Sequence, residues 1–427
     1  MRHPKHASFP RRQSAAKVLS GGQKLLLGLV CIVTLIGALI DPHHTAIGLI
    51  AFAMIFWIVF VGFKMVLWEA GQSYRYPNRH LVDFNDSHLP TYTIFLPLYK
   101  EARVVNKLAA SIGSLQYPKN KLQVLLLLEQ DDTETLEAVL NARLPKYFRI
   151  VKLLIPEPGE PQTKPRALNA GLAIATGTCC VIYDAEDRPE PDQLLKAASA
   201  FMHREDERVV CYQARLRFWN ERTNWLTRFY WAEYIAHFEW VLAGLSKLAL
   251  TPPLGGTSNH FLTSAVREVG GWDKFNVTED AEIAAALACR GYRIGMLDST
   301  TYEEATAHIC KADRQRRRWL KGYLQTGLVY TRSPLRTMRM MGARNWFSFN
   351  LMMIGTVVSF LLNPFFWGAT IVYFATRTTV IEQLFPLPLY YTGVLLMIAG
   401  NLSLFYQLVI ACLKREGFSS VKGTVQL

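Results

Sequence analysis

The placement of apolar residues constrains the fold of this chain more than any other feature of its sequence. Two apolar runs lie near the N-terminus, at residues 25–40 and 45–68, and two lie near the C-terminus, at residues 346–375 and 389–413. A helix needs about 20 mostly apolar residues to cross a bilayer, and slight thinning accommodates the shorter first run. About 270 more polar residues separate the two pairs. The sequence therefore predicts a large polar domain between transmembrane helices.

The segments around these runs refine the prediction. The short polar loop Asp41–His44 predicts that the first two spans form a helical hairpin. A cleaved signal peptide is disfavoured because the basic leader is long and a second apolar run follows within a few residues. Pro364 lies inside the third run and predicts a kink there, whereas the fourth run has no such interruption.

Lys and Arg predict the orientation, because they accumulate on the cytoplasmic side of a membrane. The loop at residues 41–44 has neither, whereas cations precede the first span and follow the last. These cations are Arg2, Lys5, Arg11, Arg12, Lys17, Lys24, Lys414 and Arg415. Both termini and the polar domain are therefore predicted to be cytoplasmic, in a multi-pass protein of the plasma membrane, which in a bacterium is the inner membrane.

The formal net charge of +13 could indicate a nucleic-acid-binding protein, but a membrane explains it more simply. Four arginines flank the third span, namely Arg332, Arg336, Arg339 and Arg344. A juxtamembrane cation gains about 1 kcal/mol from anionic lipid. The predicted partner is therefore the lipid bilayer and not nucleic acid. The seven cysteines include no CxxC pair, which predicts reduced thiols and no structural zinc.

These observations divide the chain into five predicted regions. They are a basic cytoplasmic N-terminus (1–24), a transmembrane hairpin (25–68), a cytoplasmic domain with interfacial helices at its end (69–335), two further spans (336–413) and a short cytoplasmic tail (414–427).

The polar domain alternates strand and helix patterns. Tyr92–Leu96, residues 122–128 and residues 179–183 are predicted strands, each followed by a helical pattern. This order predicts an α/β, Rossmann-like, doubly wound parallel sheet, whose ligand crevice lies beyond the carboxyl ends of the strands. The acidic groups Asp131-Asp132 and Asp184–Asp187 follow strands directly, where that rule places a ligand.

Seven motifs occur in a fixed order in this domain. They are Pro97-x-Tyr99-x-Glu101, Asp131-Asp132, Lys164-x-x-Ala167-Leu168-Asn169, Asp184-Ala185-Glu186-Asp187, Gly255-Gly256-Thr257-Ser258-Asn259, Thr278-Glu279-Asp280 and Gln315-x-x-Arg318-Trp319. In this order they resemble a family 2 glycosyltransferase of GT-A fold, in its processive membrane branch of cellulose-synthase-like, curdlan-synthase-like and hyaluronan-synthase-like enzymes. The resemblance covers more than half of the chain. It implies a hexosyltransferase that adds sugars from a UDP-sugar, with glucose favoured, to a β-linked polysaccharide and couples synthesis to export.

The acidic cluster suits a divalent cation that neutralises the leaving diphosphate. Asp184 and Glu186 are two apart on a turn after a strand and can both present oxygen ligands to Mg²⁺ or Mn²⁺. The family pattern is Asp-x-Asp, so the Glu at the third position leaves open whether Glu186 or the adjacent Asp187 is the second ligand. The alternative is a solvated turn that caps the next helix.

The resemblance assigns further donor contacts. It implies that Asp131 or Asp132 contacts uracil, that Glu101 and Asp184 line the donor site, and that Lys164 contacts phosphate or sugar. The sequence does not choose between the two aspartates. The alternative for them is capping of the helix that begins near Thr133.

Thr278-Glu279-Asp280 opens a helical pattern that ends at Gly291. Acids there also suit the positive end of a helix dipole, which is the alternative to a catalytic role. In the catalytic interpretation, which includes Glu279 in the site, Asp280 accepts the proton of the acceptor hydroxyl. A general base contributes about 10²–10⁴-fold to rate. Direct attack opposite the diphosphate inverts the anomeric centre.

Gln315, Arg318 and Trp319 share one face of a predicted helix, because they are three and four residues apart. Together with Thr257 they are assigned to the acceptor and the diphosphate. Trp can stack on a sugar ring, while Arg and Gln can hydrogen-bond hydroxyls and phosphate. The alternative is a basic amphipathic helix on lipid headgroups, and three neighbouring arginines suit that role, namely Arg314, Arg316 and Arg317.

Two other functions remain possible from the sequence. One is nonprocessive transfer of a single sugar to a lipid phosphate carrier, and the other is a noncatalytic membrane scaffold. Processive relatives have more helices after the catalytic domain than the two counted here. An export pore would therefore need another subunit or a homo-oligomer, unless the chain is naturally short or truncated.

Overall fold

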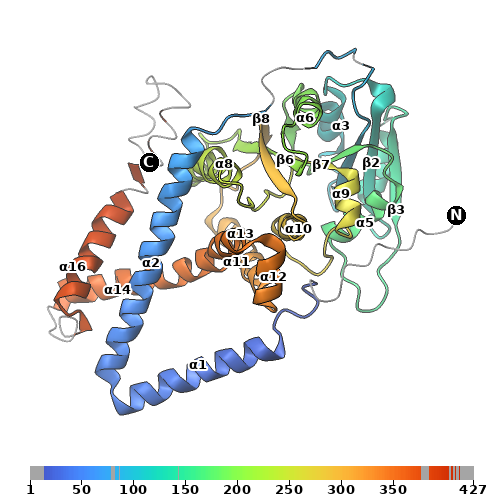
Figure 1. Cartoon of the computed structure of the whole chain (residues 1–427). Coiled ribbons are helices and arrows are strands. Elements are labelled where there is room, and N and C mark those ends of the chain that lie inside the picture. Colours follow the sequence, from blue (N-terminus) through green and yellow to red (C-terminus); the bar gives the residue numbers. More distant parts are fainter. Residues whose placement is uncertain are drawn as a thin grey trace.

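The computed structural model describes residues 14–402 apart from 78–81, 86, 143 and 377–383, together with residues 405, 406, 409 and 413. Eight strands form one sheet in the order β3-β2-β1-β4-β7-β6-β8-β5 (Figure 1). The strands are β1 Tyr92–Leu98, β2 Leu122–Glu129, β3 Phe148–Leu153, β4 Cys179–Ile182, β5 Arg188–Pro189, β6 Val209–Phe218, β7 Asn259–Leu262 and β8 Arg293–Glu303. The three predicted strands correspond to β1, β2 and β4.

The sheet is mixed, which corrects the predicted all-parallel arrangement. Strand β7 is antiparallel to both of its neighbours, β4 and β6, and β5 is antiparallel to β8, whereas all other pairs are parallel. β7 has only four residues and begins with Asn259 and His260, so no apolar run announced it. Because β7 reverses direction once, β4 and β6 still point the same way. Six strands therefore end at one edge of the sheet.

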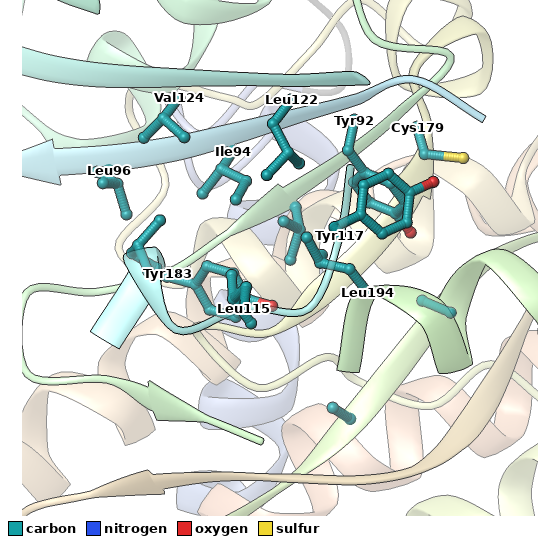
Figure 2. Close-up of a cluster of buried hydrophobic side chains, with 14 of the residues drawn as sticks. Tyr92, Ile94, Leu96, Leu115, Tyr117, Leu122, Val124, Cys179, Tyr183 and Leu194 are labelled. Atoms are coloured by element: carbon teal, nitrogen blue, oxygen red, sulfur yellow. The ribbon is translucent and has the colours of Figure 1, made fainter. Parts of the chain in front are cut away.

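Alternation along the strands builds a core on each face of the sheet. Ile94, Leu96 and Val124 belong to one buried cluster, whereas Phe95 and Leu125 belong to the cluster on the other face. Figure 2 shows the first cluster, in which Tyr92 and Tyr117 pack beside these aliphatic side chains. Burial on both faces explains why β2 is a continuous apolar run.

Helices surround the sheet and connect it to the apolar segments. In chain order they are α1 Gly21–Ile40, α2 Pro42–Gln72, α3 Val105–Gly113, α4 Thr133–Asn141, α5 Lys164–Ile174, α6 Gln193–Met202, α7 Trp225–Ile235, α8 Leu242–Lys247, α9 Thr263–Glu268, α10 Glu279–Ala288, α11 Ile309–Tyr330, α12 Pro334–Met341, α13 Ala343–Asn350, α14 Thr356–Thr376 and α16 Leu387–Leu395. Single 3₁₀ or π turns are η1 Lys119–Lys121, η2 Ala236–Val241, η3 Leu351–Gly355 and η4 Leu396–Gly400.

Three helical segments of the described chain are long and apolar enough to cross a membrane. They are α1, α2 and the continuous run Ala343–Thr376. Pro364 lies inside α14, as the third apolar run predicted. The predicted fourth span begins in α16 and η4, but most of its second half lies outside the described residues.

The first two apolar helices, which were predicted to form a helical hairpin, are joined at Asp41. Figure 1 shows them diverging from their junction, and α1 has no buried residue. Asp41 explains the junction, because its side chain accepts a hydrogen bond from the His44 backbone N–H at 3.0 Å and so caps α2, which begins with Pro42.

Helix α2 is packed firmly against the polar domain. The rings of Trp68 and Trp240 stack with centroids 4.6 Å apart. Two glycines permit this approach, because a Cβ on Gly71 would lie 2.1 Å from the Trp240 carbonyl oxygen and one on Gly244 would lie 2.0 Å from that of Leu67. The domain is therefore held directly on a helix of membrane-spanning length.

The segment before α1 is also tied to the polar domain. Ser14 Oγ donates to Asp273 Oδ1 at 3.0 Å, and Arg332 donates to the carbonyl oxygens of Ser14 and Val18 at 3.1 and 3.0 Å. Arg344 likewise donates to Leu248 O at 3.0 Å. Arg332 and Arg344, two of the four arginines that flank the third apolar run, thus also bind protein carbonyl groups.

Candidate active site

The shared edge of the six strands gathers most of the predicted site. Glu101 follows β1, Asp131 follows β2 and Asp184 follows β4, while Glu303 ends β8. The loop at residues 255–258 enters β7 at the same edge, because β7 runs in the opposite direction. The crevice beyond these strand ends is where a doubly wound sheet binds its ligand.

Lys164 joins two motifs that are far apart in the sequence. It lies at the start of α5, and its Nζ is 2.6 Å from Asp184 Oδ1 and 3.5 Å from Glu279 Oε1. Nζ also donates to the Gly256 carbonyl oxygen at 2.7 Å. Burial lowers the pKa of Lys164, but Asp184 and Glu279 outweigh it and raise the pKa overall. Lys164 is thus a fixed cation at the centre of the acidic site.

Asp280 has the properties of a base that works near neutral pH. Burial, followed by the charge of Glu279, raises the pKa of Asp280 to about 7. The Ala281 N–H donates to Asp280 Oδ1 at 2.7 Å and acts in the opposite direction. A Cβ on Gly256 would lie 3.7 Å from Asp280 Oδ2, so the glycine loop passes close to this carboxylate. Efficient general bases have a pKa near the working pH.

Asp187 and Thr257 hold the acidic turn together, which differs from their predicted roles. Asp187 Oδ2 accepts a hydrogen bond from the Asp184 N–H at 2.7 Å and another from the Thr257 hydroxyl. Both side chains are buried, at 1% and 2% exposure. Burial, with Asp184 next, raises the pKa of Asp187 well above its usual range. In this structure the two side chains tie the acidic turn to the loop at residues 255–258, and their predicted contacts with a metal, an acceptor and a diphosphate stay predictions.

Asp184 and Glu186 remain as candidate metal ligands. The Glu186 side chain reaches solvent, but its carboxylate is partly desolvated. This desolvation, together with the charges of Asp184 and Glu101, raises the pKa of Glu186. In the described part of the chain no three His, Cys, Asp or Glu side chains are grouped to hold a metal ion. Mg²⁺ is commonly bound by one or two carboxylates plus substrate phosphates. The residues therefore fit a cation that binds together with a diphosphate.

The two adjacent aspartates after β2 have different surroundings. Asp132 is buried, and its side chain accepts hydrogen bonds from the backbone N–H groups of Thr135, at 3.2 Å, and Lys100. It therefore caps α4 and fixes the Lys100 turn, where the backbone φ is 60°. Asp131 is exposed and accepts from Gln162 Nε2 at 2.8 Å. Of the pair, Asp131 is the one free to contact a ligand.

A matched pair of substitutions tests this division. Asp132→Ala should lower the melting temperature, because replacing a helix N-cap by Ala typically costs about 0.5–2 kcal/mol. Asp131→Ala should leave melting unchanged but weaken UDP binding, measured by calorimetry on the detergent-solubilised protein. Equal effects of both substitutions on UDP affinity at unchanged stability would contradict the assignment.

The Gln315–Trp319 motif lies on α11, as predicted. Gln315 and Trp319 are partly exposed and Arg318 is exposed. Trp319 packs against Tyr234 with ring centroids 6.4 Å apart, beside the end of β6. Arg316, one of the three arginines that suit the lipid alternative, forms two hydrogen bonds of 2.7 Å with the Glu233 carboxylate.

The sequence analysis missed two residues at this edge. Glu303 ends β8, and burial together with Asp187 and Asp184 raises its pKa well above the usual range. Trp219 follows β6 and is 43% exposed. Both residues could have been found from the sequence, because Glu303 ends one long strand pattern and Trp219 follows another. The strands β6 and β8 were, however, not among the predicted strands.

Comparison with protein families places these motifs in context. A model described as "Glycosyl transferase family group 2" matches residues 180–404, and one described as "Glycosyl transferase family 2" matches residues 93–263. A solved mannosyltransferase from Pyrobaculum calidifontis, in complex with GDP-Man and Mn²⁺, superposes with a TM-score of 0.53 at 20% identity, over 82% of this chain and 98% of that one. This similarity confirms a GT-A-like fold.

Three curated relatives match this chain over only part of their own length. A probable glycosyltransferase of Bacillus subtilis, YdaM, is 28% identical over 56% of each chain. A beta-monoglucosyldiacylglycerol synthase of Trichormus variabilis is 25% identical over 66% of this chain and 60% of its own. A probable glucomannan 4-beta-mannosyltransferase of Arabidopsis thaliana is 26% identical over 61% and 46%. This chain thus spans less than two thirds of each relative.

Proposed function

We propose that this chain, which belongs to glycosyl transferase family group 2, transfers a hexose from a UDP-sugar to an acceptor hydroxyl with inversion. The model of that family matches residues 180–404, which is more than half of the chain. The observation that carries this proposal is the meeting of Lys164, Asp184 and Glu279 beside a base with a pKa of about 7. A cation for the diphosphate and a base for the hydroxyl are the two groups that this reaction requires.

Each group has one task in the proposed reaction. Asp131 binds the uracil side of the donor, and Lys164, with Arg318, binds the diphosphate whose negative charge grows as the sugar leaves. Asp280 takes the proton of the acceptor hydroxyl while its oxygen attacks the anomeric carbon opposite the diphosphate. Trp319 stacks on the acceptor sugar.

A divalent metal fits the same site. Asp184 and Glu186 would hold Mg²⁺ or Mn²⁺, and the ion would supply Lewis-acid stabilisation of the leaving diphosphate. Glu101 lies at the adjoining strand end, where it would line the donor site. The buried pair Asp187 and Thr257 keeps the turn that presents Asp184.

For the acceptor we propose a β-linked glycan, with glucose as the favoured sugar, extended at the cytoplasmic face of the plasma membrane. The Gln315–Trp319 motif on a helix leading to α12 and the third apolar segment supports this choice. Export of the product would need a second copy or another subunit to complete a pore. The second candidate is transfer of one sugar to a lipid, which the glucolipid synthase among the relatives favours.

Incubation of membranes with radiolabelled UDP-sugars separates these functions. Label in an ethanol-insoluble polymer that a β-glucanase releases supports the glycan synthase, and label in a chloroform-extractable product supports the lipid acceptor. If no UDP-sugar is consumed at any divalent cation concentration, the proposed function is wrong.

Trp319→Ala tests the acceptor platform. Loss of a stacking contact of about 1 kcal/mol should impair elongation more than donor hydrolysis, in which water replaces the sugar acceptor. Polymer formation, UDP release and detergent melting are measured on one preparation. A proportional fall in all three would show that Trp319 only supports the helix.

A further inference from the structure

Large aromatic side chains are exposed on the polar domain beside the candidate active site. Trp219 is 43% exposed, Trp225 65%, Phe229 42% and Tyr302 36%. We call these four residues the aromatic shelf. They come from the end of β6, the start of α7 and the end of β8.

The first half of the shelf adjoins the acidic turn. Arg188 follows Asp187 directly, and its guanidinium lies over the Trp219 ring, 5.0 Å from the centroid. Arg188 is also the direct partner of Tyr302 in the antiparallel pairing of β5 with β8, so their side chains emerge on the same face. The Trp219 N–H donates to Glu303 O at 3.1 Å. Trp219 and Tyr302 therefore lie beside the acidic turn through Arg188, on the face of the sheet opposite the Glu303 side chain.

The second half is on α7. Trp225 and Phe229 are four residues apart and share a helix face. The adjoining face, with Leu226 and Tyr230, packs into the buried cluster that contacts Trp319. The outer face of α7 therefore continues outward from the predicted acceptor tryptophan.

Hydrogen bonds hold the two halves in a fixed relation. Asn220 exchanges two hydrogen bonds of 2.8 Å with Ala305, one through each end of its amide. Asn224, which caps α7, donates to Ala307 O at 2.9 Å. The loop between Trp219 and Trp225 is therefore fastened to the segment that follows β8.

The strand order gives the position of the shelf relative to the proposed donor site. Asp131 follows β2, Asp184 follows β4 and Trp219 follows β6, and β4 lies between the other two in the sheet. The shelf and the proposed uracil contact are consequently on opposite sides of the acidic turn. The donor nucleotide occupies one side, which leaves the shelf on the side where an acceptor would lie.

We propose that the aromatic shelf is an oligosaccharide-binding site that holds sugar units of the acceptor beyond the one at Trp319. This proposal rests on the proposed function and specifies its acceptor as a chain of several sugars. The C–H faces of pyranose rings stack on aromatic rings, and Arg188 can donate to sugar hydroxyls.

The test compares long and short acceptors with the full-length protein in nanodiscs. The probes are β-linked disaccharides and hexasaccharides of glucose, mannose and N-acetylglucosamine. Trp225→Ala and Phe229→Ala should each weaken binding of the preferred hexasaccharide by about two- to tenfold and leave disaccharide binding unchanged. Phe84→Ala is the matched control, because Phe84 is also 43% exposed but precedes β1, whose start lies at the other edge of the sheet.

The outcomes distinguish this site from the proposed reaction. Donor hydrolysis, measured as UDP release without acceptor, should be unchanged in the shelf variants. If the wild type releases no UDP, that result counts against the proposed reaction and not against the shelf. Equal hexasaccharide affinity in wild type and shelf variants overturns the shelf, as does wild-type protein that binds none of the hexasaccharides. Loss of affinity for vesicles of phosphatidylglycerol in the shelf variants, with unchanged hexasaccharide affinity, assigns the face to lipid and also overturns it.

Discussion

Asp280→Asn should lower turnover by about 10²-fold or more while leaving UDP-sugar affinity nearly unchanged. The substitution keeps the size of the side chain and removes only its ability to take a proton. Lys164, Asp184 and the other proposed donor contacts stay in place. Turnover is measured as UDP release with acceptor present, and affinity by calorimetry with the UDP-sugar. A parallel loss of donor affinity would contradict the assignment of Asp280 as the base.

The pH dependence gives the same residue a second signature. The base must be deprotonated, and the pKa of Asp280 is raised to about 7, so kcat/KM should rise between pH 6 and pH 8 in the wild type. Glu279 is one cause of the raised pKa. Glu279→Gln should therefore move this rise to lower pH, whereas Asp280→Asn should abolish it. An unchanged profile in both variants would assign the titration to another group.

The melting temperature of Asp280→Asn shows whether its lost activity comes from damage to the fold. Between about pH 4 and pH 7 the unfolded chain releases the Asp280 proton while the folded protein keeps it, so this group lowers folding stability as pH rises through that range. Asp280→Asn removes the penalty. The variant should therefore melt at or above the wild-type temperature at pH 8. A lower melting temperature would mean that its lost activity reflects damage to the fold.

The parts of the fold that the sequence predicted are those with strong local signals. The continuous apolar run of β2 was predictable because a strand that is buried on both faces needs apolar residues at every position. The long apolar helices were predictable from their length and apolar composition alone. Strand β7 could not be predicted in this way. Its residues Asn259 and His260 are fully buried in a polar network, and their place depends on β4 and β6, which are distant in the sequence.

The candidate site shows the same limit. The resemblance that the ordered motifs carry implied that Asp184, Lys164 and Asp280 belong to one site, and the structure brings the two acidic groups together around Lys164. The roles of Asp132 and Asp187 could not be predicted, because adjacent acids look alike until the backbone turns one of them inward. The partners that hold them, Lys100 and Thr257, are tens of residues away along the chain. Tertiary contacts, and not residue type, separate a ligand-facing carboxylate from a buried one.

The acidic turn gives the second large expected effect. Asp184→Asn should reduce transfer by about 10²-fold or more, because several kcal/mol of charge stabilisation at the diphosphate depend on a divalent cation. The fold should remain, since the turn is held by the Asp184 backbone N–H, which the substitution keeps. Mn²⁺ binding measured by electron paramagnetic resonance in the presence of UDP should fall in the same variant. Excess chelator should abolish wild-type transfer.

Lys164→Met is the matched variant, and it should change Mn²⁺ binding in the opposite direction. Without donor, the Lys164 ammonium lies 2.6 Å from Asp184 Oδ1 and competes with any cation for that oxygen. Its removal leaves the carboxylate free, so Mn²⁺ affinity without UDP should rise. UDP affinity should nevertheless fall, because the diphosphate loses a fixed positive charge. If Mn²⁺ binding is unchanged in both Lys164→Met and Asp184→Asn, Asp184 is not a metal ligand and its carboxylate serves only to hold Lys164.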